Sequence, residues 1–153
     1  MVTDRKEDYL EAIDEVARTK GYAKVVDIAR CLNVAPSSVT EMFQKMAEDG
    51  YLLYEKYRGV TLTEQGRKVA QETQGRHDTL KAFLTTVLGV EEHLADEDAC
   101  RIEHQLHPET MERLELFMSF VQEFQETPGW LEPLHHYLKT GKLPPGASDR
   151  QDP

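Results

Sequence analysis

Cysteine and long apolar runs are both scarce in this sequence of 153 residues. It contains only Cys31 and Cys100, which excludes a disulfide-stapled scaffold and favours a reducing cytoplasm. No apolar stretch approaches the ~20 residues that a membrane-spanning helix needs. The charged N-terminus, MVTDRKEDYLEA, lacks the apolar region of a secretory signal. These absences predict a cytoplasmic protein without a membrane partner.

Positive charge is scarce as well, but only in one half of the chain. The formal net charge is −10. Residues 1–76 hold 12 basic and 13 acidic side chains, whereas residues 77–153 hold 6 and 15. The N-terminal half is therefore nearly neutral, and its basic clusters KYR and GRK can belong to a DNA-binding face. The acidic half suits cations.

Apolar periodicity in the N-terminal half predicts three helices. They cover residues 4–18, where Asp4 is expected to cap the start, then 24–34 and 36–50. Proline 36 stands at the first turn of the third helix, where its fixed backbone angle fits. Two such helices around a short turn are typical of a helix-turn-helix motif.

The period then changes to that of β-strands. The runs YLLYEK (51–56) and VTLT (60–63), separated by YRG, predict a hairpin with a basic tip. A helix-turn-helix followed by such a hairpin is a winged helix. A long helix from Thr63 to His77 should lead into an all-helical C-terminal half, with helices at 78–88, 94–106 and 108–125 and a polar tail.

A winged helix places the N-terminal residues of its second motif helix at base edges in the major groove of DNA. The side chains in that position are Ser37, Ser38, Thr40 and Glu41, with Gln44 and Lys45 placed for the DNA backbone and Lys56, Tyr57 and Arg58 at the wing tip. Each alone fits an ordinary surface, but their ordered combination favours DNA binding. Glu41 repels phosphate, so it either reads a cytosine amine or weakens binding.

The segment ACRIEHQLH brings three metal-binding side chains to one helix face. Cys100, Glu103 and His104 are three and four residues apart, so they project together. A lone cysteine is most often a small core residue, but burying these three together without a cation would be costly. The other histidines, at positions 93, 107, 135 and 136, fit no such spacing and are expected at the surface.

Further candidate ligands lie earlier in the chain. Asp8 and Glu11 share a face of the first expected helix, and His77 lies near the end of the connecting helix. A mixed set of carboxylates, imidazoles and one thiol suits a first-row divalent ion better than Mg²⁺ or Ca²⁺, which prefer oxygen alone.

Four segments make residues 4–125 resemble the diphtheria toxin repressor family, and especially its short branch, the manganese transport regulators. They are EDYLEAI, VAPSSVTEMFQKMAEDGYLLYEKYRGVTLTEQG, the histidine in GRHDTL, and DACRIEHQL. The resemblance implies a metal-activated, homodimeric transcriptional repressor that binds a double-stranded DNA operator of metal-homeostasis genes. It also implies that the SH3-like domain of longer relatives is absent.

The implied architecture is mainly α-helical. A winged helix-turn-helix domain with a small β-hairpin wing is expected over residues 1–72, and an all-helical metal-binding and dimerisation domain over 73–141. A disordered tail is expected over 142–153. One apolar stripe is a candidate for the subunit interface, and it consists of Leu114, Phe117, Met118, Val121 and Phe124.

The resemblance implies a specific ligand set: Asp8, Glu11, His77, Cys100, Glu103 and His104. Position 100 is glutamate in the manganese regulators and cysteine in the iron-responsive branch, whereas position 8 is methionine in the iron branch. The expected metal is therefore Mn(II) or Fe(II), with Co(II) or Zn(II) as further candidates. A cation bridging the two halves of the chain would fix the angle between them and thereby favour one arrangement.

Two other functions are compatible with parts of the sequence. A winged-helix regulator can respond to a small organic ligand, with the metal-binding side chains serving structure alone. A metallohydrolase could use Glu103 as its base, but such an enzyme needs a substrate cleft, and nothing in the sequence indicates one. The chain is therefore predicted not to be an enzyme.

Overall fold

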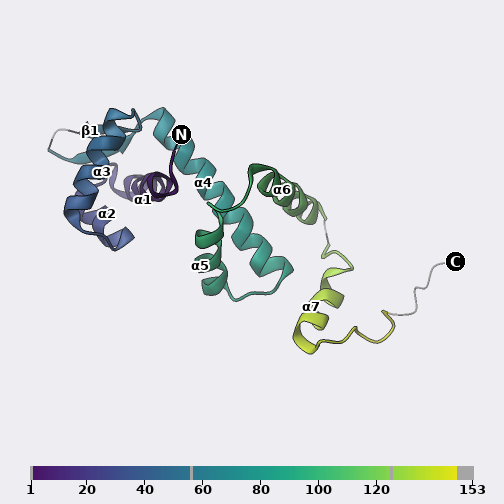
Figure 1. Ribbon diagram of the computed structural model, residues 1–153. Coiled ribbons are helices and arrows are strands. Elements are labelled where there is room, and N and C mark those ends of the chain that lie inside the picture. Colours follow the sequence, from purple (N-terminus) through teal and green to yellow (C-terminus); the bar gives the residue numbers. More distant parts are fainter. Residues whose placement is uncertain (1, 56, 125, 148–153) are drawn as a thin grey trace. The chain divides into compact units, whose positions relative to one another are not determined.

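The computed structural model describes residues 2–55, 57–124 and 126–147 (Figure 1). Lys56, predicted at the wing tip, lies outside the described residues. The chain divides into two compact units between Gly75 and Arg76. None of the described helices is long and apolar enough to cross a membrane.

The N-terminal unit begins with three helices, α1 (Asp4–Lys20), α2 (Val25–Leu32) and α3 (Pro36–Glu48). The predicted cap at Asp4 is wrong by one position, because Thr3 is the extended residue before the helix. Asp4 instead adds negative charge to the first turn, where it favours the helix dipole.

The breaks between these helices follow the local backbone preferences of their residues. Gly21 ends α1 in the left-handed region, with φ of +83°, where glycine carries no steric penalty. Asn33 ends α2 with φ of +52°, a conformation that asparagine tolerates. Pro36 opens α3, as predicted.

The wing is a two-stranded antiparallel hairpin of β1 (Leu52–Glu55) and β2 (Gly59–Leu62). Ala23, in the connection between α1 and α2, extends it by a bridge to Val60 in which each N–H donates to the other's carbonyl, at 2.9 and 2.8 Å. Gly59 permits this approach, because a Cβ there would lie 2.2 Å from the Ala23 carbonyl oxygen. The predicted winged helix is confirmed.

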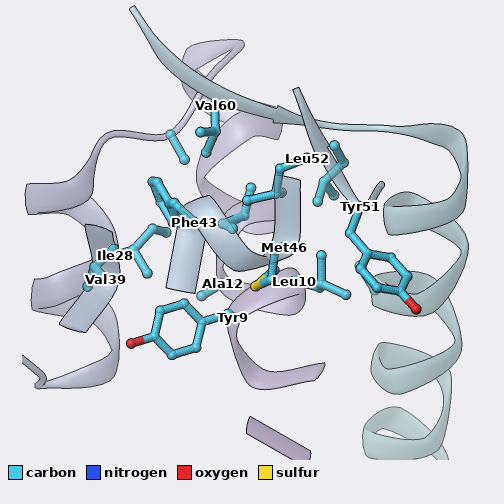
Figure 2. Packing of buried hydrophobic residues seen from close by; sticks show 14 residues of the cluster. Tyr9, Leu10, Ala12, Ile28, Val39, Phe43, Met46, Tyr51, Leu52 and Val60 are labelled. Carbon is cyan, nitrogen blue, oxygen red and sulfur yellow. The ribbon is translucent and has the colours of Figure 1, made fainter. Parts of the chain in front are cut away.

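The core of the N-terminal unit lies between the three helices and the hairpin (Figure 2). Burying each large side chain there contributes about 1.5–3 kcal/mol. The central residues expose 2% or less of their surface, and they are Tyr9, Leu10, Ile13, Ile28, Val39, Phe43, Met46, Leu52 and Val60. This packing fixes α3 against α1 and the wing.

A single long helix, α4 (Glu64–Ala82), follows the wing and continues into a π-helical turn, η1 (Phe83–Val87). The prediction of two helices that meet at His77 and residue 78 is therefore wrong. No proline interrupts this stretch, and Gly75 is tolerated inside the helix.

Thr63 caps the start of α4, since its hydroxyl accepts a hydrogen bond from the Gly66 N–H at 3.1 Å. The same hydroxyl donates to the Gly50 carbonyl at 2.7 Å. These two bonds tie the start of α4 to the end of the α3 segment.

The C-terminal unit adds α5 (Glu92–Ile102), α6 (Pro108–Glu123) and α7 (Leu131–Thr140). The predicted helix over 94–106 ends early, because residues 103–105 form a turn. A small core holds Leu80, Ala99 and Met111, with Ile102, Leu106 and Leu114 packed against it.

His135 differs from its prediction as a plain surface histidine. Its Nε2 lies 3.0 Å from the carbonyl oxygen of Thr86 and 3.2 Å from that of Val87. A nitrogen that donates to these carbonyls satisfies acceptors that the end of η1 leaves open, and it connects α7 to that turn.

Candidate functional site

One face of α3 is exposed and polar, and the other is buried. Val39, Phe43 and Met46 point into the core and expose 2% or less of their surface. The predicted DNA-contacting side chains lie on the other face: Ser37, Thr40, Glu41, Gln44 and Lys45 are exposed, and Ser38 is partly buried. The helical period thus leaves this set available to a ligand.

The Thr40 hydroxyl has a defined hydrogen-bonding role. It donates to the Pro36 carbonyl at 3.1 Å, one turn earlier in α3. With its proton engaged, the hydroxyl can offer DNA only lone pairs, and the side-chain methyl group remains free for apolar contact.

The wing tip projects Tyr57 and Arg58. Tyr57 exposes 92% of its surface and has φ of +65°, and Arg58 is also exposed. The Arg58 N–H donates to the Glu55 carbonyl at 3.1 Å, which closes the turn. Sequence reasoning missed Leu53 and Tyr54, which are 56% and 59% exposed on β1. The sequence did carry a signal for this exposure: neighbouring side chains of a strand point to opposite faces, so two adjacent apolar residues cannot both face the core.

An ion pair between a buried lysine and an exposed aspartate holds α1 against the end of α3. The Lys6 ammonium, in α1, lies 2.5 Å from the Asp49 carboxylate, at the C-terminal end of α3. The hydrogen bond from Lys6 lowers the pKa of Asp49. Lys6 is itself buried, so the pair helps to fix the orientation of the DNA-contacting helix.

The C-terminal unit buries a carboxylate between two imidazoles. Glu103 exposes 2% of its surface. Its Oε2 lies 3.0 Å from His77 Nδ1, and its Oε1 lies 3.2 Å from His104 Nε2. A buried carboxylate is costly unless positive or hydrogen-bonding groups face it. One carboxylate and two imidazoles at these distances form a donor set that fits a first-row divalent ion.

The second nitrogen of His77 faces another carboxylate. His77 Nε2 lies 3.1 Å from Asp96 Oδ1, and the Lys81 ammonium lies 3.0 Å from the same oxygen. Lys81 also lies 3.4 Å from Glu92 Oε1. The hydrogen bonds from Lys81 and then from His77 lower the pKa of Asp96, and Asp96 in turn raises the pKa of Lys81.

Sequence reasoning missed Lys81 and Asp96. Lys81 follows His77 by four residues, and Asp96 precedes Cys100 by four. Each therefore shares a helix face with a predicted ligand, and this spacing was the signal that could have revealed both.

Cys100 is exposed on α5, so the alternative of a core cysteine is wrong. It lies three residues before Glu103, on the last turn of the helix. In the N-terminal unit, Asp8 and Glu11 lie one turn apart on α1, and both are partly buried. The assignment of Asp8, Glu11 and Cys100 as ligands stays a prediction.

The apolar stripe predicted for the subunit interface is partly internal. Met118 and Val121 are buried, and only Phe124 of the five residues is exposed. Leu116 and Phe120 of α6, which are outside that stripe, form an exposed row with Phe124, which directly follows the helix. These three residues are 62%, 52% and 46% exposed. The rings of Phe120 and Phe124 pack edge to face with centroids 5.0 Å apart.

Comparison with known proteins covers both units. The family described as "Iron dependent repressor, N-terminal DNA binding domain" matches residues 1–60. The family described as "Iron dependent repressor, metal binding and dimerisation domain" matches residues 63–127. The HTH-type transcriptional regulator MntR of Geobacillus kaustophilus is 45% identical over 139 residues, which are 91% of this chain and 96% of that protein.

Two solved structures of longer proteins have the same fold. The crystal structure of IdeR from T. acidophilum aligns with a TM-score of 0.69 and 29% identity, over 84% of this chain and 57% of that one. The structure of the manganese regulator SloR aligns with a TM-score of 0.66 and 29% identity, over 75% of this chain and 54% of that one. This chain thus spans little more than half the length of these two proteins.

Proposed function

The chain belongs to the iron-dependent repressor family, and we propose that it represses transcription of metal-homeostasis genes when Mn(II) or Fe(II) is bound. The observation that carries this proposal is the buried Glu103 carboxylate between His77 and His104. It lies in the segment that matches a metal-binding and dimerisation domain. Such a regulator is not an enzyme, and it acts in the cytoplasm, where its DNA is.

In this proposal the N-terminal unit binds double-stranded DNA. The exposed face of α3 enters the major groove, and the wing tip contacts phosphates or the minor groove. The wing residues are proposed to supply affinity for any sequence, because contacts to phosphate carry no sequence information. Selectivity is assigned to the residues at the start of α3: Ser37, Ser38, Thr40 and Glu41.

The proposed metal ligands are the six residues expected from the family resemblance: Asp8, Glu11, His77, Cys100, Glu103 and His104. The carboxylates supply the hard oxygen donors that Mn(II) prefers, and the imidazoles and the Cys100 thiolate suit Fe(II), Co(II) and Zn(II). The bound ion supplies positive charge that neutralises this acidic cluster. The protein's contribution is to hold the donors together, and a bound ion would compete with protons for them.

Metal binding raises DNA affinity through a population shift. A cation that binds the DNA-competent arrangement of the homodimer more tightly than any other arrangement increases its fraction. Only this difference in metal affinity between the two arrangements can shift the equilibrium between them. The exposed row Leu116, Phe120 and Phe124 is the proposed subunit contact, in place of the stripe predicted from the sequence.

The proposal is tested by DNA binding with controlled metal content. Duplexes are selected from random DNA by the Mn(II)-loaded protein, and their affinity is then measured by fluorescence anisotropy with Mn(II), with Fe(II) under anaerobic conditions, or with chelator. We expect tight, sequence-selective binding with metal and a large loss with chelator. The His77→Ala variant should bind weakly under both conditions.

Two outcomes would contradict the proposal. Equal affinity with metal and with chelator would favour a regulator that responds to an organic ligand. Metal-dependent turnover of chromogenic esters or phosphates that disappears in Glu103→Ala would favour the metallohydrolase.

A further inference from the structure

His77 is held between two carboxylates, and only one of them belongs to the proposed ligand set. Its Nδ1 lies 3.0 Å from Glu103 Oε2, and its Nε2 lies 3.1 Å from Asp96 Oδ1. We propose that Asp96 is a positioning residue of the metal site, which holds His77 in the Nε2–H tautomer and leaves the Nδ1 lone pair for a metal ion. This inference rests on the proposed role of His77 as a ligand.

The tautomer follows from the number of protons on the ring. A neutral imidazole has one N–H donor and one nitrogen with a lone pair. A nitrogen that binds a metal ion cannot carry a proton, so a ring that binds through Nδ1 keeps its proton on Nε2. Asp96 is the carboxylate at that nitrogen, and it accepts the hydrogen bond that this tautomer donates.

Lys81 holds Asp96 in this position. The Lys81 ammonium lies 3.0 Å from Asp96 Oδ1, the oxygen that also faces His77 Nε2. Because Lys81 follows His77 by one turn of α4, the two donors come from the same rigid element. Asp96 therefore receives an N–H and an ammonium together, which fixes its orientation over the ring.

The same arrangement argues against Asp96 as a metal ligand. A second divalent ion at Asp96 would lie close to the ammonium of Lys81, and like charges at such distances repel. Glu92, on α5, places its Oε1 3.4 Å from the same ammonium. The carboxylates of Asp96 and Glu92 are therefore both paired with the Lys81 cation. Lys81 thus fills the place where a further ion could bind.

An ordinary surface ion pair is the alternative, since Asp96 is about half exposed and such pairs contribute about 0–1 kcal/mol. The burial of His77 distinguishes a positioning role of Asp96 from an ordinary surface ion pair. Only 13% of its side-chain surface is exposed, so its ring is confined between the two carboxylates. Asp96 therefore accepts the N–H that the ring keeps when a metal ion takes the place of a proton at Nδ1.

The test measures the tautomer and the metal affinity separately. Long-range ¹H–¹⁵N correlation spectra of the ¹⁵N-labelled protein loaded with diamagnetic Zn(II), in which the ion takes the place of one ring proton, identify the nitrogen of His77 that stays protonated. Competition with a fluorescent chelator measures Mn(II) affinity. We expect the Nε2–H tautomer in the wild type, a mixture in Asp96→Ala, and a 10–100-fold lower Mn(II) affinity in that variant.

Conservative and control variants sharpen the result. Asp96→Asn keeps an oxygen that can accept from Nε2–H, so it should recover part of both the tautomer preference and the affinity. Asp98→Asn, on the same helix and near Arg101 instead, should match the wild type. Circular dichroism of each variant checks that the fold is retained.

Three results would overturn the inference. The first is a wild-type proton on Nδ1, and the second is an Mn(II) affinity in Asp96→Ala within twofold of the wild type. The third is loss of affinity in Asp96→Ala with an unchanged tautomer, which would make Asp96 a direct ligand. An unchanged affinity in His77→Ala would instead remove His77 from the ligand set. Metal binding as expected without any effect on DNA would contradict the repressor function alone.

Discussion

The α-carbon of Gly66 lies against the backbone of Tyr51. A Cβ at position 66 would come within 2.2 Å of the Tyr51 carbonyl oxygen, which is closer than any real contact. The first turn of α4 therefore packs directly on the backbone of the residue that precedes β1. Gly75, in the same helix, has nothing within 4 Å of its own Cβ position.

These two glycines predict opposite effects of the same substitution. Gly66→Ala should destabilise the protein by about 1–3 kcal/mol or more, because backbone atoms must move apart to admit the methyl group. Gly75→Ala should stabilise it by about 0.5–1 kcal/mol, because alanine loses less backbone freedom in a helix. Urea unfolding followed by circular dichroism measures both. Equal effects of the two substitutions would refute the close packing at Gly66.

Asp27 predicts a pH dependence of stability. The Asp27 Oδ1 lies 2.6 Å from the Lys20 ammonium, and its Oδ2 accepts a hydrogen bond from the Lys24 backbone N–H at 3.2 Å. The hydrogen bond from Lys20 is the main cause that lowers the pKa of the Asp27 carboxyl. A carboxyl whose pKa is lower in the folded state stabilises the protein above the unfolded-state value and loses this contribution as the pH falls through the folded-state value.

Asp27→Asn should therefore reduce the free energy of unfolding at pH 7 by about 0.2–1 kcal/mol, the range for exposed pairs. The difference from the wild type should shrink below pH 4. Lys20→Met should show the same pH window, since it removes the other partner. A difference that stays constant from pH 7 to pH 2.5 would rule out the ion pair as its source.

Arg58 should contribute to DNA affinity without sequence preference. If its guanidinium contacts one phosphate, Arg58→Ala should weaken binding to every duplex and reduce the slope of log affinity against log salt by about one unit. Fluorescence anisotropy at several salt concentrations measures this slope. Arg113→Ala, exposed on α6, is the matched control. Wild-type affinity and slope in Arg58→Ala would place the wing outside the interface.

The exposed row on α6 should control the oligomeric state. Phe120→Ser removes a half-exposed ring from that row, and it should raise the dimer dissociation constant at least about tenfold, in line with the loss of one large aromatic from an interface. Tyr137→Ser, equally exposed on α7, should leave the constant unchanged. Sedimentation velocity over a concentration series measures both variants. A dimer that persists unchanged in Phe120→Ser would assign the interface to another surface.

Cys100 should lower the preference of the site for Mn(II) relative to Fe(II) and Co(II). A thiolate is softer than a carboxylate, so Cys100→Glu should strengthen Mn(II) activation relative to Fe(II) and Co(II) and flatten the pH dependence of metal affinity. A thiolate bond to Co(II) gives a near-ultraviolet charge-transfer band. Absence of this band in the wild type, or its survival in Cys100→Ser, would exclude Cys100 as a ligand.

The N-terminal unit followed closely from its sequence, because its signals are local. Pro36 and the apolar period placed α3, and the change of period at residue 51 located the wing. The continuity of α4 through His77 was missed, because the sequence was divided into one helix that ends at His77 and another over 78–88. The residues on both sides of position 78 nevertheless continue the helical period, and packing favours one continuous helix over two.

The candidate site was predictable where spacing along one helix defines it, and not where two elements meet. Glu103 and His104 were identified from their spacing to Cys100, but the contacts of His77 with Glu103 and Asp96 join residues 26 and 19 positions apart. The exposure of Phe120 was also missed, because two apolar rows run along α6. The sequence pattern alone does not say which of them packs within the unit.

The π-helical turn η1 gives this segment a tolerance for changes in length. Its hydrogen bond from the Leu88 N–H to the Phe83 carbonyl, at 3.3 Å, spans one residue more than an α-helical bond. A π-turn is equivalent to one residue inserted into an α-helix, so deletion of a residue here can be absorbed by a return to the α-helical period. His77 and Lys81 precede this turn, so their side chains would still point toward Asp96. The Thr86 and Val87 carbonyls would rotate away from His135, so we expect single-residue length differences among relatives to occur together with changes at position 135.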